Sequence, residues 1–229
     1  VVKHKAHPML GIELLEFLRN AKEYNRLICS GINSKTIALY SYLGLYTNHL
    51  NQYLIINKKI QNFNILKVED NASIKQINFI ENSQYSLTKV KESELDFNFD
   101  SQEYIPYKDK KYFVKRYFNH PMYDYSVYSI NKKETLSSLI ITREVVVKNS
   151  KILRIMDYLG DEIDIVYITK YLYKIILDND YEYIDFVCFG FSEKTLGKAC
   201  FTKIDFNSNE LIAPNYFAPF VQENIQIHF

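Results

Sequence analysis

The chain contains 229 residues with 28 basic and 27 acidic side chains, which gives a net charge of +1, and 47% of its residues are hydrophobic. This length fits one large or two small domains, and the apolar content is sufficient for a normal core. The balanced charge argues against the electropositive surface that nucleic-acid binding requires. No apolar run reaches ~18 residues and no charged-then-apolar leader is visible, so we expect a cytoplasmic protein without a membrane span.

The three cysteines, Cys29, Cys188 and Cys200, are odd in number and widely spaced in apolar strand-like or helical segments. This usage predicts reduced core residues of a cytosolic protein, and we expect no metal site. The first residue, Val1, is not a start methionine, and residues 1–4 have the pattern of a strand already under way. We therefore expect the chain to be part of a longer protein.

The first 57 residues predict alternating strands and helices. The predicted order is strand 1–4, loop 5–9, helix 10–21, strand 26–30, helix within 33–45 and strand within 46–57. Leu10, Leu14 and Leu18 share one face of the first helix. The strand at 26–30 is predicted to be short and buried.

The helix within residues 33–45 carries its own start and stop signals. Asn33 or Ser34 accepts the N-cap hydrogen bond, and Gly44 stands where a helix ends with a residue in the left-handed region. Between them, Ile37, Tyr40 and Leu43 recur on one helical face.

Residues 58–105 predict a linker region. It contains a strand at 63–68 and a charged segment at 86–99 that is either a helix or a partly ordered connector. A new α/β unit follows, and its predicted order is helix 108–120, strands 125–131, 137–147 and 152–159, helix 163–178, strand 183–189, helix 192–200 and extended segments over 201–229. Pro121 ends the first of these helices.

The pattern N-x-x-x-(I)-A-L-Y-x-x-(L)-G-(F/L) over residues 33–45 resembles the fourth helix of the GCN5-related N-acetyltransferases, which lies beside the thiol end of acetyl-CoA. The resemblance implies that residues 1–57 are the back half of an acetyltransferase fold, with acetyl-CoA or another acyl-CoA as co-substrate. It places Tyr40 at the family's proton-donor position and Asn33 among the cofactor-binding residues. A phenol with an unperturbed pKa of about 10 is able to exchange a proton with a departing thiolate.

Members of this family carry (Q/R)-x-x-G-x-(G/A) before the preceding helix, where backbone N–H groups hold the CoA pyrophosphate. In this chain Ala6 stands at the first position, Met9 at the first glycine and Gly11 at the last, so one of three signature positions is kept. The resemblance implies cofactor contacts from this segment, namely from Lys5, Ala6, His7, Met9, Leu10 and Gly11. Lys5 and His7 either supply positive charge or are solvated loop residues.

The second half resembles a whole acetyltransferase domain that follows half of another. This tandem arrangement is found in acetyltransferase-like proteins encoded with bacterial surface-polysaccharide genes, and residues 112–121 and 153–161 look like segments of that group. The implied fold is α/β, an acetyltransferase-like mixed sheet flanked by helices. Its parts are a partial first unit at 1–60, a linker region at 61–103 and a degenerate second unit at 104–229.

The second unit lacks a phosphate-binding loop of its own. Asp161, Glu162 and Asp164 cluster at the predicted helix start, where they suit the helix dipole but repel a pyrophosphate. We therefore expect this unit to hold an acceptor rather than CoA. Arg154 and Asp157 interrupt an apolar strand, and such charged residues are either paired with each other in the core or face a cleft that takes the acceptor.

The aromatic content, 20 Tyr and 15 Phe without any Trp, admits two interpretations. Aromatic rings stack on sugar faces, but Tyr also fills half-buried strand positions. We interpret most of these residues as structural and leave Tyr104, Tyr107, Tyr123 and Tyr125 open as sugar-stacking candidates.

Two function classes follow. In the first, the protein is an acyl-CoA-dependent N- or O-acyltransferase, most simply an acetyltransferase, acting on a sugar or glycan precursor through positioning and proton donation. In the second, it is a non-catalytic binding or scaffold protein that has kept the fold, which the loss of signature residues at Ala6 and Met9 favours. Binding of acetyl-CoA discriminates between the two classes.

Overall fold

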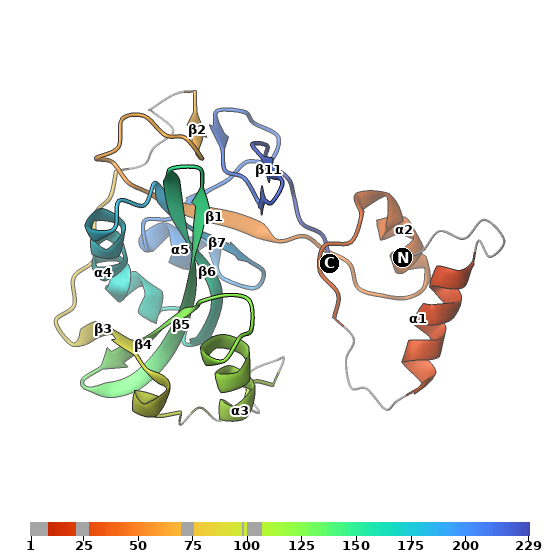
Figure 1. Ribbon diagram of the computed structural model, residues 1–229, viewed down its shortest axis with the longest axis horizontal. Coiled ribbons are helices and arrows are strands. Elements are labelled where there is room, and N and C mark those ends of the chain that lie inside the picture. The colour runs from red at the N-terminus through yellow and green to blue at the C-terminus, as the bar shows by residue number, and fades with distance from the viewer. Residues whose placement is uncertain (1–8, 22–27, 70–75, 98, 100–106) are drawn as a thin grey trace. The chain divides into compact units, whose positions relative to one another are not determined.

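A computed structural model of the protein describes residues 9–21, 28–69, 76–97, 99 and 107–229. The chain forms two compact units (Figure 1). The first contains residues 1–49 and 227–229, and the second contains residues 50–226. The C-terminal tripeptide therefore belongs to the unit that the N-terminal residues form.

The described residues of the first unit form two helices and a short 3₁₀ turn. They are α1 (Leu10–Ala21), the 3₁₀ turn Ser34–Thr36 and α2 (Ile37–Tyr42). The predicted caps are confirmed: the side chain of Asn33 accepts from the backbone N–H of Lys35 at 2.9 Å, and Gly44 has a φ of 75°. Because Leu45 N–H donates to Tyr40 O and Gly44 N–H to Ser41 O, α2 ends in a Schellman motif.

The C-terminus closes this unit by strand-like pairing. His228 accepts from the backbone N–H groups of Gly31 and Ile32 at 2.8 and 3.2 Å, and Asn48 and Phe229 exchange two hydrogen bonds of 2.9 Å. These bonds join the C-terminal residues to two segments in the first fifty residues of the chain.

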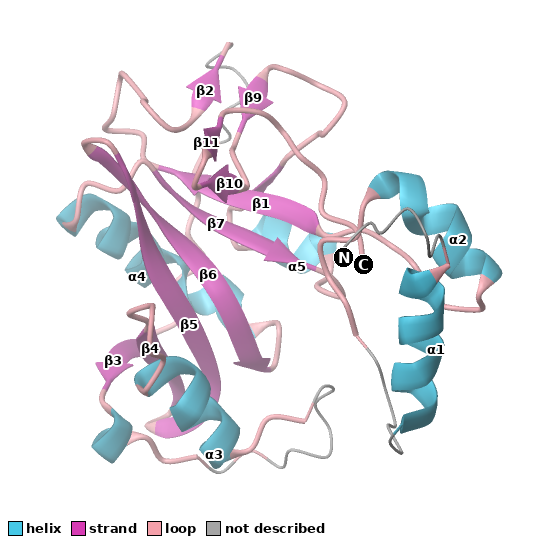
Figure 2. Cartoon of the chain, turned by 45° about the vertical axis from the view of Figure 1, so that its right-hand side comes forward, coloured by secondary structure: helices cyan, strands magenta, loops and turns pink. Residues whose placement is uncertain are grey.

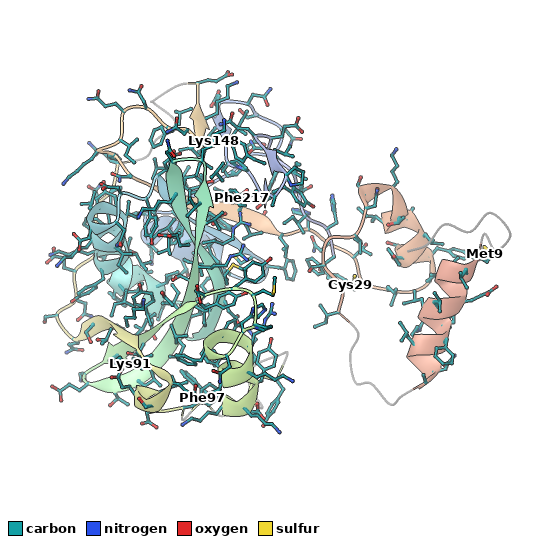
Figure 3. All side chains as sticks on the ribbon, viewed as in Figure 1. Met9, Cys29, Lys91, Phe97, Lys148 and Phe217 are labelled. Atoms are coloured by element: carbon teal, nitrogen blue, oxygen red, sulfur yellow. The ribbon has the colours of Figure 1, made fainter. Side chains whose placement is uncertain are left out.

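The apolar faces of this unit are open to solvent in the described residues, as Phe17 (67% exposed) and Tyr42 (86%) illustrate. Figure 3 labels Met9 at the start of α1 and Cys29 in the following segment. The predicted buried strand at 26–30 is wrong in its described part, because residues 28–30 form no strand and Ile28 is 61% exposed. Cys29 is exposed, so its assignment to the core is also wrong. The predicted strand at 1–4 lies outside the described residues.

The second unit contains a seven-stranded mixed sheet in the order β3-β4-β5-β6-β7-β1-β8. The strands are β3 (Tyr85–Val90), β4 (Ser126–Lys132), β5 (Thr135–Val147), β6 (Ser150–Gly160), β7 (Tyr183–Cys188), β1 (Asn51–Ile56) and β8 (Thr202–Lys203). Neighbours are antiparallel except β6 and β7, which run parallel and are joined through a helix. This is the connection that parallel strands require.

Successive residues of the central strands face opposite sides of the sheet. On one side, α4 (Asp164–Asp178) and α5 (Glu193–Lys198) cover a core that includes Ile140, Ile155 and Leu172. On the other side, α3 (Lys110–Phe113) and the π-helix η4 (Val114–Phe118) cover Leu139, Ile141 and Leu159. We call the first side the α4 face and the second side the α3 face.

A third apolar cluster occupies the far end of the α3 face and includes Leu54, Ile152 and Tyr183. It is covered by two small two-stranded sheets. One pairs β2 (Lys67–Val68) with β9 (Leu211–Ile212), and the other pairs β10 (Tyr216–Phe217) with β11 (Phe220–Val221). Figure 2 shows these short strands near one end of the long strands β5 and β6 and α3 near the other end.

The predicted α/β class, with a mixed sheet flanked by helices, is confirmed. Most predicted elements of the second half are present within a few residues. Residues 85–90 are a strand instead of the predicted helix or connector, the predicted strand at 63–68 shrinks to β2, and a turn of 3₁₀ helix at Glu92–Glu94 follows β3. Strand β1 pairs with β7 and β8, so the compact units divide before residue 50 and not at the predicted boundary of 60. No helix in the described part of the chain is long and apolar enough to cross a membrane.

Candidate functional site

The parallel strands β6 and β7 stay paired over a short distance only. Residues 153–155 pair with residues 184–186, yet β6 continues to Gly160 and β7 to Cys188. The two strands therefore part towards their carboxyl ends. In open α/β sheets this is where ligands bind, because loops and strand ends there leave polar groups unpaired.

A bulge in β6 sets which side chains face this region. Ile141 pairs with Asp157 and Thr142 with Ile155, so Met156 has no partner in β5. The extra residue reverses the alternation of side chains after it, as β-bulges do. As a result Arg154 and Asp157, an odd number of residues apart, both lie on the α3 face.

On the α4 face the gap between the parting strands is filled by aromatic side chains. The ring of Phe191 packs edge-on against Tyr158 at 5.1 Å and against Phe186 at 5.0 Å. All three belong to or pack against the core beneath α4. A ligand on this side would have to displace part of that core.

Carboxylates of the chain itself occupy the helix starts next to this gap. Asp164 is 1% exposed and accepts from the hydroxyls of Ser137 and Ser138 at 2.6 Å each. Glu162 accepts from the Ser192 N–H and the Thr195 hydroxyl, both at 2.9 Å, at the start of α5. The side chain of Asp161 accepts from the N–H of Ile163. The arrangement leaves the start of α4 negatively charged, and this does not fit a CoA pyrophosphate.

Arg154 is part of a buried network on the α3 face. Its Nε lies 3.0 Å from both carboxylate oxygens of Asp185, and its Nη2 lies 2.5 Å from Oδ2. It also donates to Pro214 O and to Asn215, and Asn215 reaches Gln52 at 3.2 Å. Burial by itself lowers the pKa of Arg154, but Asp185 outweighs it, so the net direction is upward. The donors of Arg154 are consumed within the chain.

Asp157 forms an ion pair with Lys108, which is not among the predicted site residues. Lys108 Nζ lies 2.5 and 2.6 Å from its two carboxylate oxygens, and the Tyr117 hydroxyl donates to Oδ2. The Tyr158 N–H donates to Oδ1 at 2.9 Å. The interpretation of Arg154 and Asp157 as a pair with each other is therefore wrong, because each binds a different partner. Their role in binding an acceptor stays a prediction, and their hydrogen bonding favours a structural role.

The π-helix η4 positions Tyr117 over this carboxylate. Burial, followed by the charge of Asp157, raises the pKa of Tyr117 far above its ordinary value. The phenol therefore stays protonated and acts as a fixed donor. Single π-helical turns often occur at functional sites because they shift the side chains of one turn relative to the next.

Aromatic side chains continue from Tyr117 across the α3 face. Tyr125 packs edge-on against Tyr117 at 5.4 Å and against His120 at 5.4 Å, and His120 stacks on Tyr123 at 5.2 Å. The guanidinium of Arg143 lies 4.4 Å from the centre of the Tyr123 ring. We call the connected set the α3-face cluster, and its members are Lys108, Tyr117, His120, Tyr123, Tyr125, Arg143 and Asp157.

Of the aromatic candidates, Tyr123 and Tyr125 are thus members of this cluster, and their rings contact its other side chains. Tyr107 is 60% exposed, and Tyr104 lies outside the described residues. A separate cavity of about 310 Å³ lies nearer the β3 edge and is lined in part by Thr88, Ser129 and the carboxylates of Glu94 and Asp96. With two acidic side chains in its lining, it does not suit an anion.

The candidates in the first unit are placed as follows. Tyr40 is half-buried in α2, and its hydroxyl makes no hydrogen bond to any described residue. The side chain of Asn33 is used in the helix cap. Met9 is 53% exposed, and Leu10 and Gly11 begin α1 with backbone N–H groups that donate to no described residue. Lys5, Ala6 and His7 lie outside the described residues.

The N–H donors of a helix start and the helix dipole both favour negative charge. The role of Met9, Leu10 and Gly11 in binding a CoA pyrophosphate stays a prediction. Among the residues that the structure describes, no group of three or more His, Cys, Asp or Glu side chains is arranged to hold a metal ion.

Four members of the α3-face cluster are not among the residues predicted from the sequence: Lys108, Tyr117, His120 and Arg143. Arg143 carried the same signal as Arg154, a charged residue within an apolar strand, and the same reasoning applied to β5 would have found it. Lys108 and Tyr117 carried no comparable signal. Their roles depend on contacts with Asp157, which follows them by 49 and 40 residues.

No protein-family model matches the chain, and a search of curated proteins finds no match either. Among solved structures, the chain is similar to a functionally unknown conserved protein from Staphylococcus epidermidis, with a TM-score of 0.51 and 10% identity over 100% of this chain and 81% of that one. It is also similar to a GCN5-related N-acetyltransferase from Anabaena variabilis, with a TM-score of 0.44 and 14% identity over 83% of this chain and 45% of that one. The first similarity concerns the fold alone, and the second score is too low to carry an argument.

Proposed function

We propose that the protein is an acyl-CoA-dependent acyltransferase, most simply an acetyltransferase, that acts on a sugar or glycan precursor. One observation carries the proposal: the parallel strands β6 and β7 part after three residue pairs, and polar and aromatic side chains gather on the α3 face beside the parting. The order of helices and strands in the second unit, which resembles that of an acetyltransferase domain, supports the same class.

In this proposal the two units have different tasks. The acceptor belongs to the second unit, whose helix starts carry Glu162 and Asp164 instead of free N–H donors. The acyl-CoA belongs to the segment that begins α1, and it would supply the acyl group as a thioester. Tyr40 would donate the proton that the departing thiolate needs, and its hydroxyl has no competing hydrogen bond to a described residue.

A non-catalytic binding protein is the second candidate. The aromatic filling between β6 and β7 favours it, because Tyr158, Phe186 and Phe191 occupy the α4-face side of the gap. Such a protein would bind the acceptor without transferring an acyl group.

Acetyl-CoA binding and turnover by the whole protein distinguish the two candidates. We expect a calorimetric binding signal with acetyl-CoA and release of free CoA when an acceptor is present. Tyr40→Phe should lower turnover by roughly 10²-fold, because it removes a proton donor while leaving the ring in place. The melting temperature should change little.

Tyr42→Phe is the matched control, since Tyr42 lies on the same helix and is 86% exposed. Full turnover in the Tyr40→Phe variant would remove the assignment of Tyr40. Absence of any acetyl-CoA binding would reject the enzyme in favour of the binding protein.

A further inference from the structure

Two arginines lie side by side on the α3 face with different surroundings. Arg143 of β5 is directly opposite Arg154 of β6 in the antiparallel register, so both side chains leave the same face. Like charges placed directly opposite destabilise a strand pair unless they are compensated. Arg154 is compensated by the carboxylate of Asp185, whereas Arg143 forms no ion pair with any described residue.

Arg143 leaves one positive charge without a carboxylate partner among the described residues of this cluster. Lys108, Arg143 and Arg154 supply three cations, and the described carboxylates that pair with them are those of Asp157 and Asp185. The helical segment 110–118 adds four further basic residues and no acidic one. The local field therefore favours a negatively charged ligand.

The aromatic side chains hold Arg143 in place without using its hydrogen bonds. Its guanidinium lies over Tyr123, and Tyr123 is in turn stacked on His120, which contacts Tyr125. A guanidinium on an aromatic face keeps its in-plane N–H donors available for a carboxylate or phosphate. Arg143 is thus positioned for recognition at a half-buried site, where a charged hydrogen bond is stronger than in bulk water.

His120, which stacks on the same tyrosine ring, offers a second N–H donor. Its Nδ1 accepts from the backbone N–H groups of Met122 and Tyr123, both at 3.1 Å. Because Nδ1 acts as the acceptor, the proton of the neutral ring lies on Nε2. The Nε2–H donates to no described residue.

We propose that Arg143, together with His120, binds an anionic group of the sugar acceptor, either a carboxylate or a phosphate. This inference rests on the proposed function for the identity of the acceptor, but the anion site itself is argued from the α3-face cluster alone. Tyr123 and Tyr125 act as positioning residues that hold the two donors.

Binding to the full-length protein tests the proposal without acyl-CoA. Three probes are compared by calorimetry or by ligand-observed NMR: glucuronate, glucose 1-phosphate and glucose. We expect one or both anionic sugars to bind at least about tenfold more tightly than glucose, because a hydrogen bond to a charged group contributes about 1.5–3 kcal/mol. The two anionic probes identify whether the carboxylate or the phosphate is preferred.

Variants of Arg143 connect the binding to the site. Arg143→Gln should weaken binding of the preferred anion by about tenfold or more and leave glucose unaffected. Arg143→Lys should give an intermediate loss, because it keeps the charge but not the planar fork. Lys89→Gln is the matched control, since Lys89 is an exposed cation on the other face of the same sheet, and it should bind as the unaltered protein does.

Three results would overturn the proposal. The first is equal affinity for all three probes, and the second is no binding of any probe. The third is undiminished anion binding by Arg143→Gln with an unaltered melting temperature. The outcomes also separate it from the proposed function. Arg143-dependent anion binding without acetyl-CoA turnover would leave the anion site standing and reject the acyltransferase. Acyl transfer to neutral acceptors only would leave the acyltransferase standing and reject the anion site.

Discussion

At the scale of single residues, the second unit depends on charged groups that are fully removed from water. Asp185 is 0% exposed and accepts hydrogen bonds from Arg154 and Gln52, and Asn215 is hydrogen-bonded to both of these residues. Burial of an ion is costly, and the cost is offset only when its partners satisfy every polar atom. The network therefore ties the segment around Asn215 to β6, β7 and β1.

Asp185→Ala should be strongly destabilising for this reason. It leaves Arg154 as an uncompensated buried cation, and removal of one partner of a buried pair costs about 3–5 kcal/mol. Urea denaturation followed by circular dichroism measures the loss as a lower midpoint. Glu69→Ala is the control, because its ion pair with Lys67 is about half-exposed and its loss should leave the midpoint nearly unchanged.

At the scale of elements, a glycine at the open end of the β5–β6 hairpin, away from its turn, allows the two strands to approach closely. Gly160 has a φ of 128°, and a Cβ placed there would lie 2.1 Å from Ser138 Oγ and 2.6 Å from Ser138 Cα. Ser138 in turn donates to Asp164 at the start of α4. One glycine therefore allows the strand pair and the helix start to share a hydrogen-bonded junction.

Gly160→Ala should disrupt this junction. The added methyl group meets backbone and side-chain atoms of Ser138, and the positive φ adds strain for any residue with a Cβ. We expect a clear drop in melting temperature and faster amide exchange at the start of α4. Gly190→Ala is the matched control, since Gly190 has a φ of 92° but a methyl group added there would meet no atom within 4 Å, so only the conformational cost applies.

At the scale of the whole molecule, the sheet of the second unit joins distant parts of the chain, and tyrosines fill much of the space around it. β1 lies between β7 and β8, although both of these strands follow it in the chain by more than a hundred residues. It contributes Tyr53 to the core beneath α4. Burial raises the pKa of Tyr53 to about 12 and that of Cys188, also beside this core, from 9.0 to about 12. Burial also raises the pKa of Tyr128 and of Tyr181.

The protein should therefore lose stability in alkaline solution. These groups are neutral when protonated, and their pKa is higher in the folded than in the unfolded state. Their contribution is fully present below the unfolded values, near 9.0 for Cys188 and 10.0 for Tyr53, and is lost as the pH rises through about 12. The urea midpoint at neutral and at alkaline pH measures the loss. Tyr53→Phe should reduce the alkaline part of it, and the exposed Tyr42→Phe should not.

The elements of the second unit follow from local patterns that the sequence contains. The apolar spacing of residues 163–178 predicts α4, and apolar runs between turn residues predict β4 to β7, because helix and strand periodicities are properties of neighbouring residues. The caps of α2 at Asn33 and Gly44 are equally local and are confirmed. The strand β3 was not predicted because its polar, largely exposed pattern at the sheet edge resembles a connector.

The tertiary structure alone decided which residues meet. The sequence indicated that Arg154 and Asp157 are not ordinary surface charges, but their partners, Asp185 and Lys108, are 31 and 49 positions away. The bulge at Met156 places both side chains on one face, and the register of β5 against β6 places Arg143 next to Arg154. Strand register and crossover connections bring together residues that are distant in the chain, and local periodicity carries no information about such pairs. The sequence pattern therefore determined α4, the strands β4 to β7 and the caps of α2, whereas the packing of these elements decided which side chains surround Arg143.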